Sequence, residues 1–225
     1  MSTDFSLWLY GSYARGDADA FSDVDLLLVS DLSLPDAYLK HFIPARLSSA
    51  SVSRYSWSEV LKMSEYGSLF LQHLRLEGEA VYETPSCRGI LSFLLSKMSA
   101  YKLIERDLKG FMAVLEDVRN SLGSGGSESY ELAVLGTVLR HCSILGCWVL
   151  DQPCFSRFEP VARVVETFGL DPRISREFPW LYQNRIYLEG RIQKHDLVKA
   201  CDSLVWLDRV YLVVNSIKDY AHDKY

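Results

Sequence analysis

Cysteine is scarce in this sequence and is not arranged for cross-linking. The five cysteines, an odd number, lie mostly inside apolar segments, and none forms a Cys-x-x-Cys pair. This pattern excludes a disulfide-built secreted scaffold and is typical of reduced core residues in an intracellular protein. The first residues have no basic stretch and only a short apolar run, which excludes a signal peptide. No stretch approaches the roughly 20 apolar residues of a membrane span, so we expect a cytoplasmic protein with no membrane partner.

Positive charge is also in deficit. The 225 residues include 24 Lys and Arg against 29 Asp and Glu, a formal net charge of -5. A surface that attracts nucleic acid over its whole area is therefore excluded, and any polyanion site must be local. Apolar residues make up 48% of the chain, enough for a real core. Domains commonly run to about 100–200 residues, so we expect two here.

Residues 1–85 predict an α+β domain. Short apolar, β-branched or aromatic runs that are typical of strands occupy Phe5–Tyr10, Val24–Ser30, Ser51–Trp57 and Glu79–Glu83. Helical patterns occupy Trp57–Ser64 and Ser68–Glu77, and Gly78 follows as a C-cap.

Residues 86–225 predict an all-α bundle, because apolar residues now recur every three or four positions. The pattern predicts one long helix from Ile90 to Val118, a Gly and Ser connector over 123–127 and an apolar helix over Tyr130–Leu150. A last helix is expected over Asp196–Tyr220. Prolines separate shorter helices in between, at Pro153, Pro160, Pro172 and Pro179.

One short stretch carries the chemistry. Gly11 follows a predicted strand and Ser12 opens a predicted helix, so backbone amides, the Ser12 hydroxyl and the positive helix end converge where a phosphate would sit. Glycine is needed there because a side chain would keep the phosphate away. Asp23 and Asp25 are two apart on a strand, so both carboxylates lie on one face and can share a hard ion such as Mg²⁺, while Val24 points into the core.

Two further residues of this stretch leave alternatives open. Arg15 can reach a phosphate oxygen or pair with a neighbouring acid such as Asp17 or Asp19. Ser22 can hydrogen-bond beside the metal acids or simply end a turn.

The ordered pattern resembles the signature of the DNA polymerase β-like nucleotidyltransferase superfamily. The resemblance lies in Gly11-Ser12, Arg15-Gly16 and Ser22-Asp23-Val24-Asp25-Leu26, and a weaker likeness extends through 66–74 and Glu77-Gly78. It implies a mixed sheet with flanking helices. It also implies transfer of a nucleoside monophosphate from a nucleoside triphosphate, ATP by family habit, to an acceptor hydroxyl with Mg²⁺ or Mn²⁺. The nucleotide is expected in a cleft between the two domains.

The sequence departs from this superfamily at the third metal carboxylate, which its active members carry on the next strand. That strand has Ser51 and Ser53 where an acid should stand, and the nearest acid, Glu59, lies in the following helix. Three explanations remain: two acids with a ligand from substrate or water, a carboxylate from the helical domain, or nucleotide binding without transfer. The last would make the protein a regulatory or antitoxin-like defence partner.

The helical domain is predicted to be HEPN-like or substrate-binding. Arg140-His141 resembles the opening of the HEPN ribonuclease motif, but no His follows four to six positions later, which counts against ribonuclease activity. His73, on an apolar helical face, is expected to be a hydrogen-bonded core residue. The acceptor stays open between an RNA end, a protein and a small molecule, and pairing of two copies through the helical domain is a further expectation.

Overall fold

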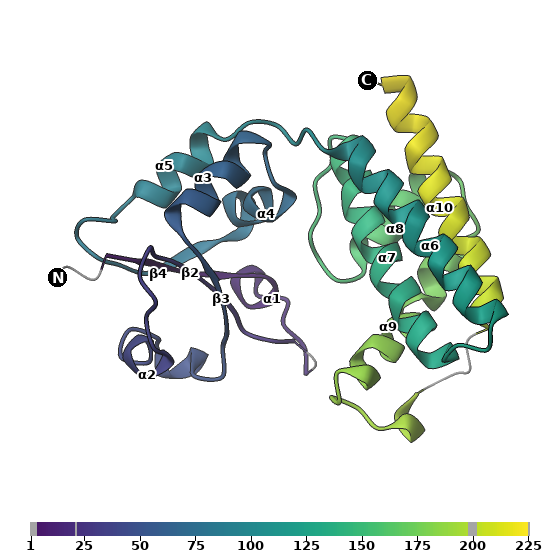
Figure 1. Cartoon of the computed structure of the whole chain (residues 1–225), viewed down its shortest axis with the longest axis horizontal. Helices are drawn as coiled ribbons and strands as arrows, with labels where there is room; N and C mark the ends of the chain where they lie inside the picture. The colour runs from purple at the N-terminus through teal and green to yellow at the C-terminus, as the bar shows by residue number, and fades with distance from the viewer. Residues whose placement is uncertain (1–3, 21, 198–201, 225) are drawn as a thin grey trace. The chain divides into compact units, whose positions relative to one another are not determined.

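The chain consists of two compact units (Figure 1). The computed structural model describes residues 4–20, 22–197 and 202–224, and the units are Met1–Lys102, here the N-terminal unit, and Leu103–Tyr225, here the helical unit. The sequence predicts the division after residue 85. The later division follows from helix α5 (Ile90–Lys97), because Leu91 and Leu95 are buried in the core of the N-terminal unit.

The described part of the N-terminal unit contains a four-stranded mixed sheet in the order β3-β2-β1-β4. Strand β1 is antiparallel to both β2 and β4, and β2 is parallel to β3. The four predicted strands are confirmed and differ only at their ends. Their bounds are β1 (Ser6–Tyr10), β2 (Asp25–Val29), β3 (Ser51–Tyr55) and β4 (Glu79–Glu83).

Helices cover both faces of this sheet (Figure 1). Alternate residues of β1 and β2 point to opposite faces, so Leu7 and Leu26 pack on one side while Trp8 and Leu27 pack on the other. The first side is covered by α2 (Asp36–Leu39) and the 3-10 turn Ala45–Leu47. The second is covered by α3 (Trp57–Glu65), α4 (Leu69–Glu77) and α5.

The long helix predicted from Ile90 to Val118 is two helices in the structure. Helix α5 ends at Lys97 and α6 (Ile104–Gly123) begins after a non-helical segment. That segment is tied back onto the N-terminal unit, because the Gln72 side-chain amide donates to the Ser99 carbonyl at 3.0 Å and the Lys102 amide donates to the Tyr66 carbonyl at 3.0 Å. These bonds use backbone groups that a continuous helix would need for itself.

Helix α7 (Glu128–Val149) forms the centre of the helical unit and packs against the four other long helices of that unit. Those helices are α6, α8 (Glu159–Thr167), α9 (Arg173–Leu188) and α10 (Ser203–Lys224). Gly146 permits this packing, because a Cβ there would lie 2.9 Å from side-chain atoms of both Val164 and Ile217.

Helix α7 also corrects the expectation that no stretch approaches a membrane span. By length and composition alone it would cross a membrane, and it is the one such helix among the described residues. Most of it is buried inside the helical unit, and a core helix of that kind has the same composition.

Two further helix boundaries differ from the predicted ones. Pro179 lies inside α9 instead of ending a helix, and the neighbouring Phe178 and Leu181 are fully buried, so tertiary packing holds this turn in place. The predicted helix over Asp196–Tyr220 is a 3-10 turn at Lys194–Asp196 and then α10. Residues 198–201, including Cys201, lie outside the described part.

Candidate nucleotide and metal site

The turn after β1 brings the predicted phosphate loop against the predicted metal acids. Gly11 has φ 75° and ψ -154°, and a Cβ built on it would lie 3.0 Å from Oδ2 of Asp25. Only glycine adopts this backbone conformation without strain. The chain then turns into α1 (Ser12–Arg15), a single turn of four residues closed by a bond from the Arg15 amide to the Gly11 carbonyl at 3.1 Å.

Helix α1 is too short to act as the positive helix end that the sequence predicts. A helix dipole sums over aligned peptide units, and one turn provides few of them. What the loop offers an anion is therefore local, namely the first amides of α1 and the half-buried Ser12.

Asp25 begins β2, and Asp23 and Val24 lie just before it. Val24 is only 4% exposed and belongs to the core on one face of the sheet, as predicted. Asp25 pairs with Tyr10 of β1 and faces the opposite side. Asp23 is exposed and Asp25 is half-buried.

Ser22 is occupied by the turn before the metal acids. Its hydroxyl donates to Oδ1 of Asp19 at 2.8 Å and accepts from the Asp19 amide at 2.9 Å. Of the two roles left open for Ser22, the geometry supports the turn.

The position across from Asp25 on the next strand has no acid. Ser51 is the register partner of Asp25 in the parallel β2–β3 pair. The nearby Glu59 is engaged elsewhere, because its carboxylate accepts from the Ser56 amide at 2.7 Å in a capping box that starts α3. Within the described residues no group of three His, Cys, Asp or Glu side chains is arranged to hold a metal ion. Among the described residues, the strand beside Asp25 therefore supplies no third acid.

Two hydroxyl groups occupy the surface beside Asp25 instead. The Tyr10 phenol and the Ser53 hydroxyl lie 3.2 Å apart, so the Tyr10 side chain reaches over β2 to β3. Burial and the negative charge of Asp25 raise the pKa of Tyr10, although the Ser53 hydrogen bond opposes them. Tyr10 therefore stays a neutral phenol at physiological pH and supplies no charge to a cation.

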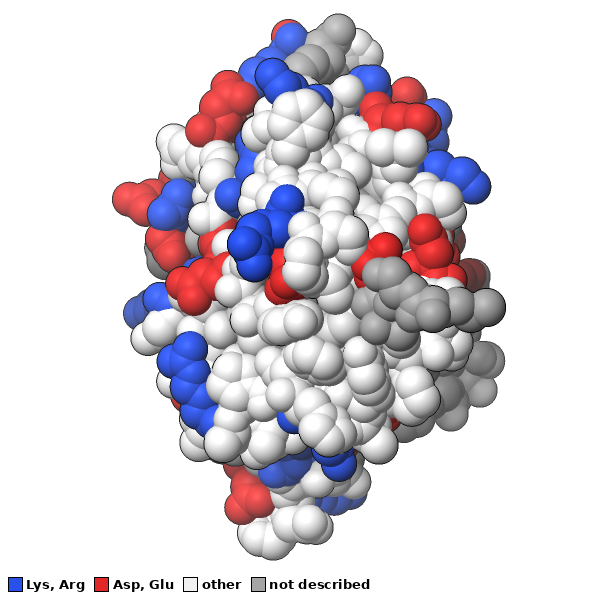
Figure 2. All heavy atoms as spheres, turned by 90° about the vertical axis from the view of Figure 1, so that its left-hand side faces the viewer, with Lys and Arg blue, Asp and Glu red and all other residues white. Residues whose placement is uncertain are grey.

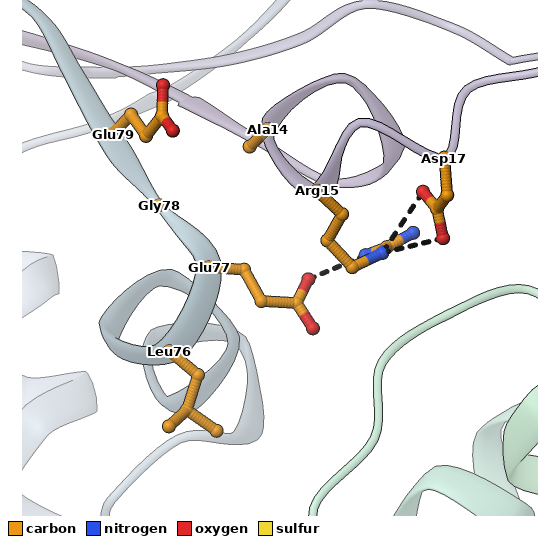
Figure 3. Close-up of a pocket in the computed structure, with 7 residues that line it drawn as sticks. All are labelled: Ala14, Arg15, Asp17, Leu76, Glu77, Gly78 and Glu79. Carbon is orange, nitrogen blue, oxygen red and sulfur yellow. Dashed lines mark hydrogen bonds and ion pairs between the residues drawn. The ribbon is translucent and has the colours of Figure 1, made fainter.

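Arg15 binds carboxylates of its own unit, one of the alternatives that the sequence leaves open. Its Nη1 lies 2.6 Å from Oε2 of Glu77, and its Nε lies 3.0 Å from Oδ2 of Asp17 (Figure 3). The same Glu77 oxygen is 2.8 Å from Nε2 of His73. Burial alone would raise the pKa of Glu77, but hydrogen bonds from His73 and Arg15 outweigh it and lower the pKa.

This network connects the phosphate loop to α4. Arg15 stands in α1, directly after Gly11 and Ser12, whereas His73 and Glu77 stand one turn apart on α4. The Tyr10 ring packs edge-on against His73, with centroids 5.8 Å apart. Through Glu77, Arg15 thus ties the loop after β1 to α4.

A cavity of about 510 Å³ lies beside this network (Figure 3). Acidic groups dominate its charged lining, with Asp17, Glu77 and Glu79 against Arg15. Figure 3 shows Arg15 between Glu77 and Asp17. In its charge this cavity is unlike a triphosphate pocket.

The sequence missed the roles of His73, Glu77 and Tyr10. His73 is hydrogen-bonded and only 13% exposed in its side chain, as a core histidine would be, but its partners belong to the site. The signal that could have found it is the spacing of His73 and Glu77, which places both on one face of α4.

The matching family decides what this region is. Residues 1–67 match the profile of the Nucleotidyltransferase domain family. This part of the chain is a nucleotidyltransferase domain. The match includes the Gly11 turn, both aspartates and the β3 strand with Ser51, and the α+β fold of the nucleotidyltransferase domain is the one that the motif resemblance implied.

Comparisons with whole proteins add little to this. No curated protein matches the chain. Among solved structures, one described as a toxin-antitoxin with AMP-PNP aligns over 53% of this chain and 89% of its own, at 16% identity and a TM-score of 0.28. A nucleotidyltransferase-like protein from Exiguobacterium sibiricum 255-15 aligns over 99% of this chain and 69% of its own, at 14% identity and a TM-score of 0.34. Both TM-scores are too low to bear on fold or function.

Charge on the surface agrees with a local site rather than a broad one. On the face shown in Figure 2, Lys and Arg are scattered among Asp and Glu and do not gather into a basic patch. The nucleotidyltransferase domain therefore offers no continuous basic surface for nucleic acid on this face.

Proposed function

We propose that the nucleotidyltransferase domain binds a nucleoside triphosphate with a divalent cation and transfers the nucleoside monophosphate to an acceptor hydroxyl. The observation that carries this proposal is the contact between Gly11 and Asp25. The turn that can hold phosphate lies so close to the carboxylate that can hold metal that a Cβ on Gly11 would be 3.0 Å from Oδ2 of Asp25. A phosphate bound at Gly11 would share its cation with Asp25.

The donor set fits Mg²⁺ or Mn²⁺ at one position. Mg²⁺ keeps several waters and is commonly bound by one or two carboxylates together with substrate phosphates. Asp23, just before β2, and Asp25, its first residue, would supply those carboxylates, and the cation would neutralise charge on the triphosphate and on the leaving pyrophosphate. A second position lacks its acid, because Ser51 stands opposite Asp25.

The chain's own residues then have separate tasks in the reaction. The Ser12 hydroxyl and the first amides of α1 hold phosphate oxygens in line for displacement. Arg15, held by Glu77, keeps that turn in place. Because the strand beside Asp25 has no carboxylate base, the acceptor hydroxyl loses its proton to water or to a group that comes with the acceptor.

A labelled-transfer experiment tests the activity. The purified protein is incubated with each α-labelled nucleoside triphosphate and Mg²⁺ or Mn²⁺, with RNA, protein and small-molecule acceptors in separate reactions. We expect label on one acceptor class and release of pyrophosphate, with ATP as the preferred donor. The Asp23→Asn/Asp25→Asn double variant should give neither, and transfer that survives in it would refute the mechanism.

A second candidate function is nucleotide binding without transfer, as a regulatory or antitoxin-like defence module. Ser51 opposite Asp25 is the observation that favours it, because the strand lacks the acid that activates an acceptor. Protection against thermal unfolding separates the two, since a ligand at about 100 times its Kd adds about 2.7 kcal/mol of stability. Protection without pyrophosphate release in any reaction would establish the binding module.

The proposal also includes the cellular location of the protein and the role of the helical unit. We place the protein in the cytoplasm, supported by the buried, unbridged state of the four described cysteines, Cys87, Cys142, Cys147 and Cys154. The helical unit would act as the substrate-binding or HEPN-like part, and pairing of two copies through it is testable by sedimentation. In that unit Arg140 donates to the Phe155 carbonyl at 3.1 Å, a structural bond.

A further inference from the structure

The helical unit has a second cavity, lined by residues of that unit. It has a volume of about 460 Å³ and is lined by residues of α6, α7 and the end of α9. Its walls are mostly apolar, and they include Phe111, Val114, Tyr130, Val134 and Leu188. Pockets of roughly 300–1,000 Å³ with apolar walls and a few polar groups are the usual form of small-molecule sites.

Part of this apolar lining is exposed to solvent. Tyr130 is 56% exposed and Leu188 is 47% exposed, although both contribute to the wall of the cavity. Covering this apolar surface with an apolar ligand removes it from water, which favours binding.

Polar side chains also line the cavity, and one of them, Arg185, is positively charged. His141, Arg185 and Glu189 line the cavity, and Nε of Arg185 lies 2.8 Å from Oε1 of Glu189. The Arg185 guanidinium also lies over the Tyr182 ring, 5.6 Å from its centroid, which restrains its direction. Thr137 also lines the cavity, and its hydroxyl donates to the Ala133 carbonyl of the same helix at 2.9 Å.

Glu189 has a second cationic partner, so Arg185 can turn from Glu189 to a ligand. Arg191 is also hydrogen-bonded to the Glu189 carboxylate, through the other oxygen. If Arg185 turns to a ligand anion, Glu189 keeps a charged partner, so the exchange leaves no carboxylate unpaired. His141 also lines the cavity, and its ring can donate to the same anion.

We propose that this cavity binds a small amphipathic anion, with the apolar body between Phe111, Val134 and Leu188 and the anionic group on Arg185 and His141. A cationic ligand of the same shape would meet Arg185 as a like charge, and the lining carboxylate, Glu189, is already paired with Arg185 and Arg191. A neutral ligand would bury the same apolar area without the charge-assisted hydrogen bond. The cavity therefore selects by charge as well as by apolar area.

Displacement of a fluorescent probe tests this selection on the full chain. The probe is 8-anilinonaphthalene-1-sulfonate, and the competitors are octanoate, octanol and octylamine, which share one chain length and differ in charge. We expect octanoate to displace the probe about tenfold more tightly than octanol, because only octanoate makes a charge-assisted hydrogen bond to Arg185. Octylamine should be the weakest. Equal displacement by all three, tighter displacement by octylamine, or none by octanoate at about 1 mM would overturn the proposal.

Matched variants locate the binding. Leu188→Glu places a negative charge in the wall of the cavity at an exposed position, and Leu204→Glu makes the same change at an exposed position on α10. We expect the first to abolish octanoate binding and the second to leave it unchanged. Arg185→Gln should remove the preference for octanoate over octanol, whereas Arg173→Gln, on the same helix and paired with Asp171, should not.

Thermal unfolding of each variant accompanies these measurements, so that loss of fold is not mistaken for loss of binding. Octanoate affinity that is unchanged in Arg185→Gln, or lost equally in Leu188→Glu and Leu204→Glu, would show that the cavity is not the site. Because the proposal does not depend on nucleotide transfer, these outcomes leave the proposed activity of the other unit untouched.

Discussion

Gly11 and Asp25 lie so close that a single methyl group on Gly11 would approach the Asp25 carboxylate to 3.0 Å. The two residues are 14 positions apart in sequence and are brought together by the antiparallel pairing of β1 and β2. This relationship joins the proposed phosphate-binding turn to the strand that begins with the proposed metal ligand Asp25. The predictions below concern this site and the contacts that hold its unit together.

Gly11→Ala should weaken nucleotide binding and lower stability by about 1–3 kcal/mol, because the backbone conformation is strained for any other residue and the new Cβ crowds Asp25. The measurement is chemical denaturation together with the thermal shift caused by a nucleoside triphosphate and Mg²⁺. Gly16→Ala is the control, because Gly16 also has φ 75° but no atom within 4 Å of an added Cβ. It should cost about 1 kcal/mol and keep the thermal shift, and a shift lost equally in both would refute the role of the Gly11 contact.

Ser51→Asp should restore the missing acid. Ser51 is exposed and stands opposite Asp25, so a carboxylate there adds a third oxygen ligand on the same face of the sheet. We expect a lower Mg²⁺ requirement and a transfer rate raised about tenfold or more, as for an added catalytic base. Ser58→Asp adds the same charge at an exposed site in the first turn of α3 and should change neither. An unchanged rate in Ser51→Asp would mean that the third position is not where the acid acts.

Glu77→Gln should destabilise the N-terminal unit by about 1–2 kcal/mol at neutral pH, because it removes charged partners from both Arg15 and His73. The folded state lowers the pKa of Glu77 below its ordinary value of 4.5. Its contribution is therefore complete above pH 4.5 and is lost as the pH falls through the lowered pKa.

The free energies of unfolding of wild type and Glu77→Gln, measured against pH, should accordingly converge in acid. Glu79→Gln changes an exposed carboxylate that lines the same cavity and should show no such gap. A gap between wild type and Glu77→Gln that persists unchanged below the lowered pKa would assign the effect to packing rather than charge.

Gly67→Ala should destabilise the N-terminal unit by about 3 kcal/mol or more, the range of strain and overpacking together. Gly67 has φ 71°, and an added Cβ would lie 2.3 Å from the Ala100 carbonyl oxygen. The segment between α5 and α6 would have to move away. The midpoint of urea unfolding measures the effect. Gly89→Ala, with φ 73° and open space around it, should cost only the backbone strain, and equal costs would refute the close contact.

The sequence alone determined the parts of this protein that depend on neighbours in the chain. The pattern of residues 23–25 predicts Val24 in the core and both aspartates on the other face, because side chains of a strand alternate, and Val24 is buried as predicted. The order of strand, turn, helix and strand around Gly11 follows from similarly local patterns, as do the four strands of the sheet. The absence of a third acid was also visible, since no acid occurs in the strand through Ser51 and Ser53.

Only the tertiary structure decided the contacts between residues far apart in sequence. Arg15 and Glu77 are 62 positions apart, and whether Arg15 takes a phosphate or a carboxylate depends on where α4 packs. The register that places Ser51 opposite Asp25 depends on a parallel pairing of β2 and β3. The break between α5 and α6 has the same origin. The apolar period continues through residues 98–103, but the backbone there is hydrogen-bonded to Tyr66 and Gln72 instead of forming a helix. The periodicity of one segment cannot reveal partners from elsewhere in the chain.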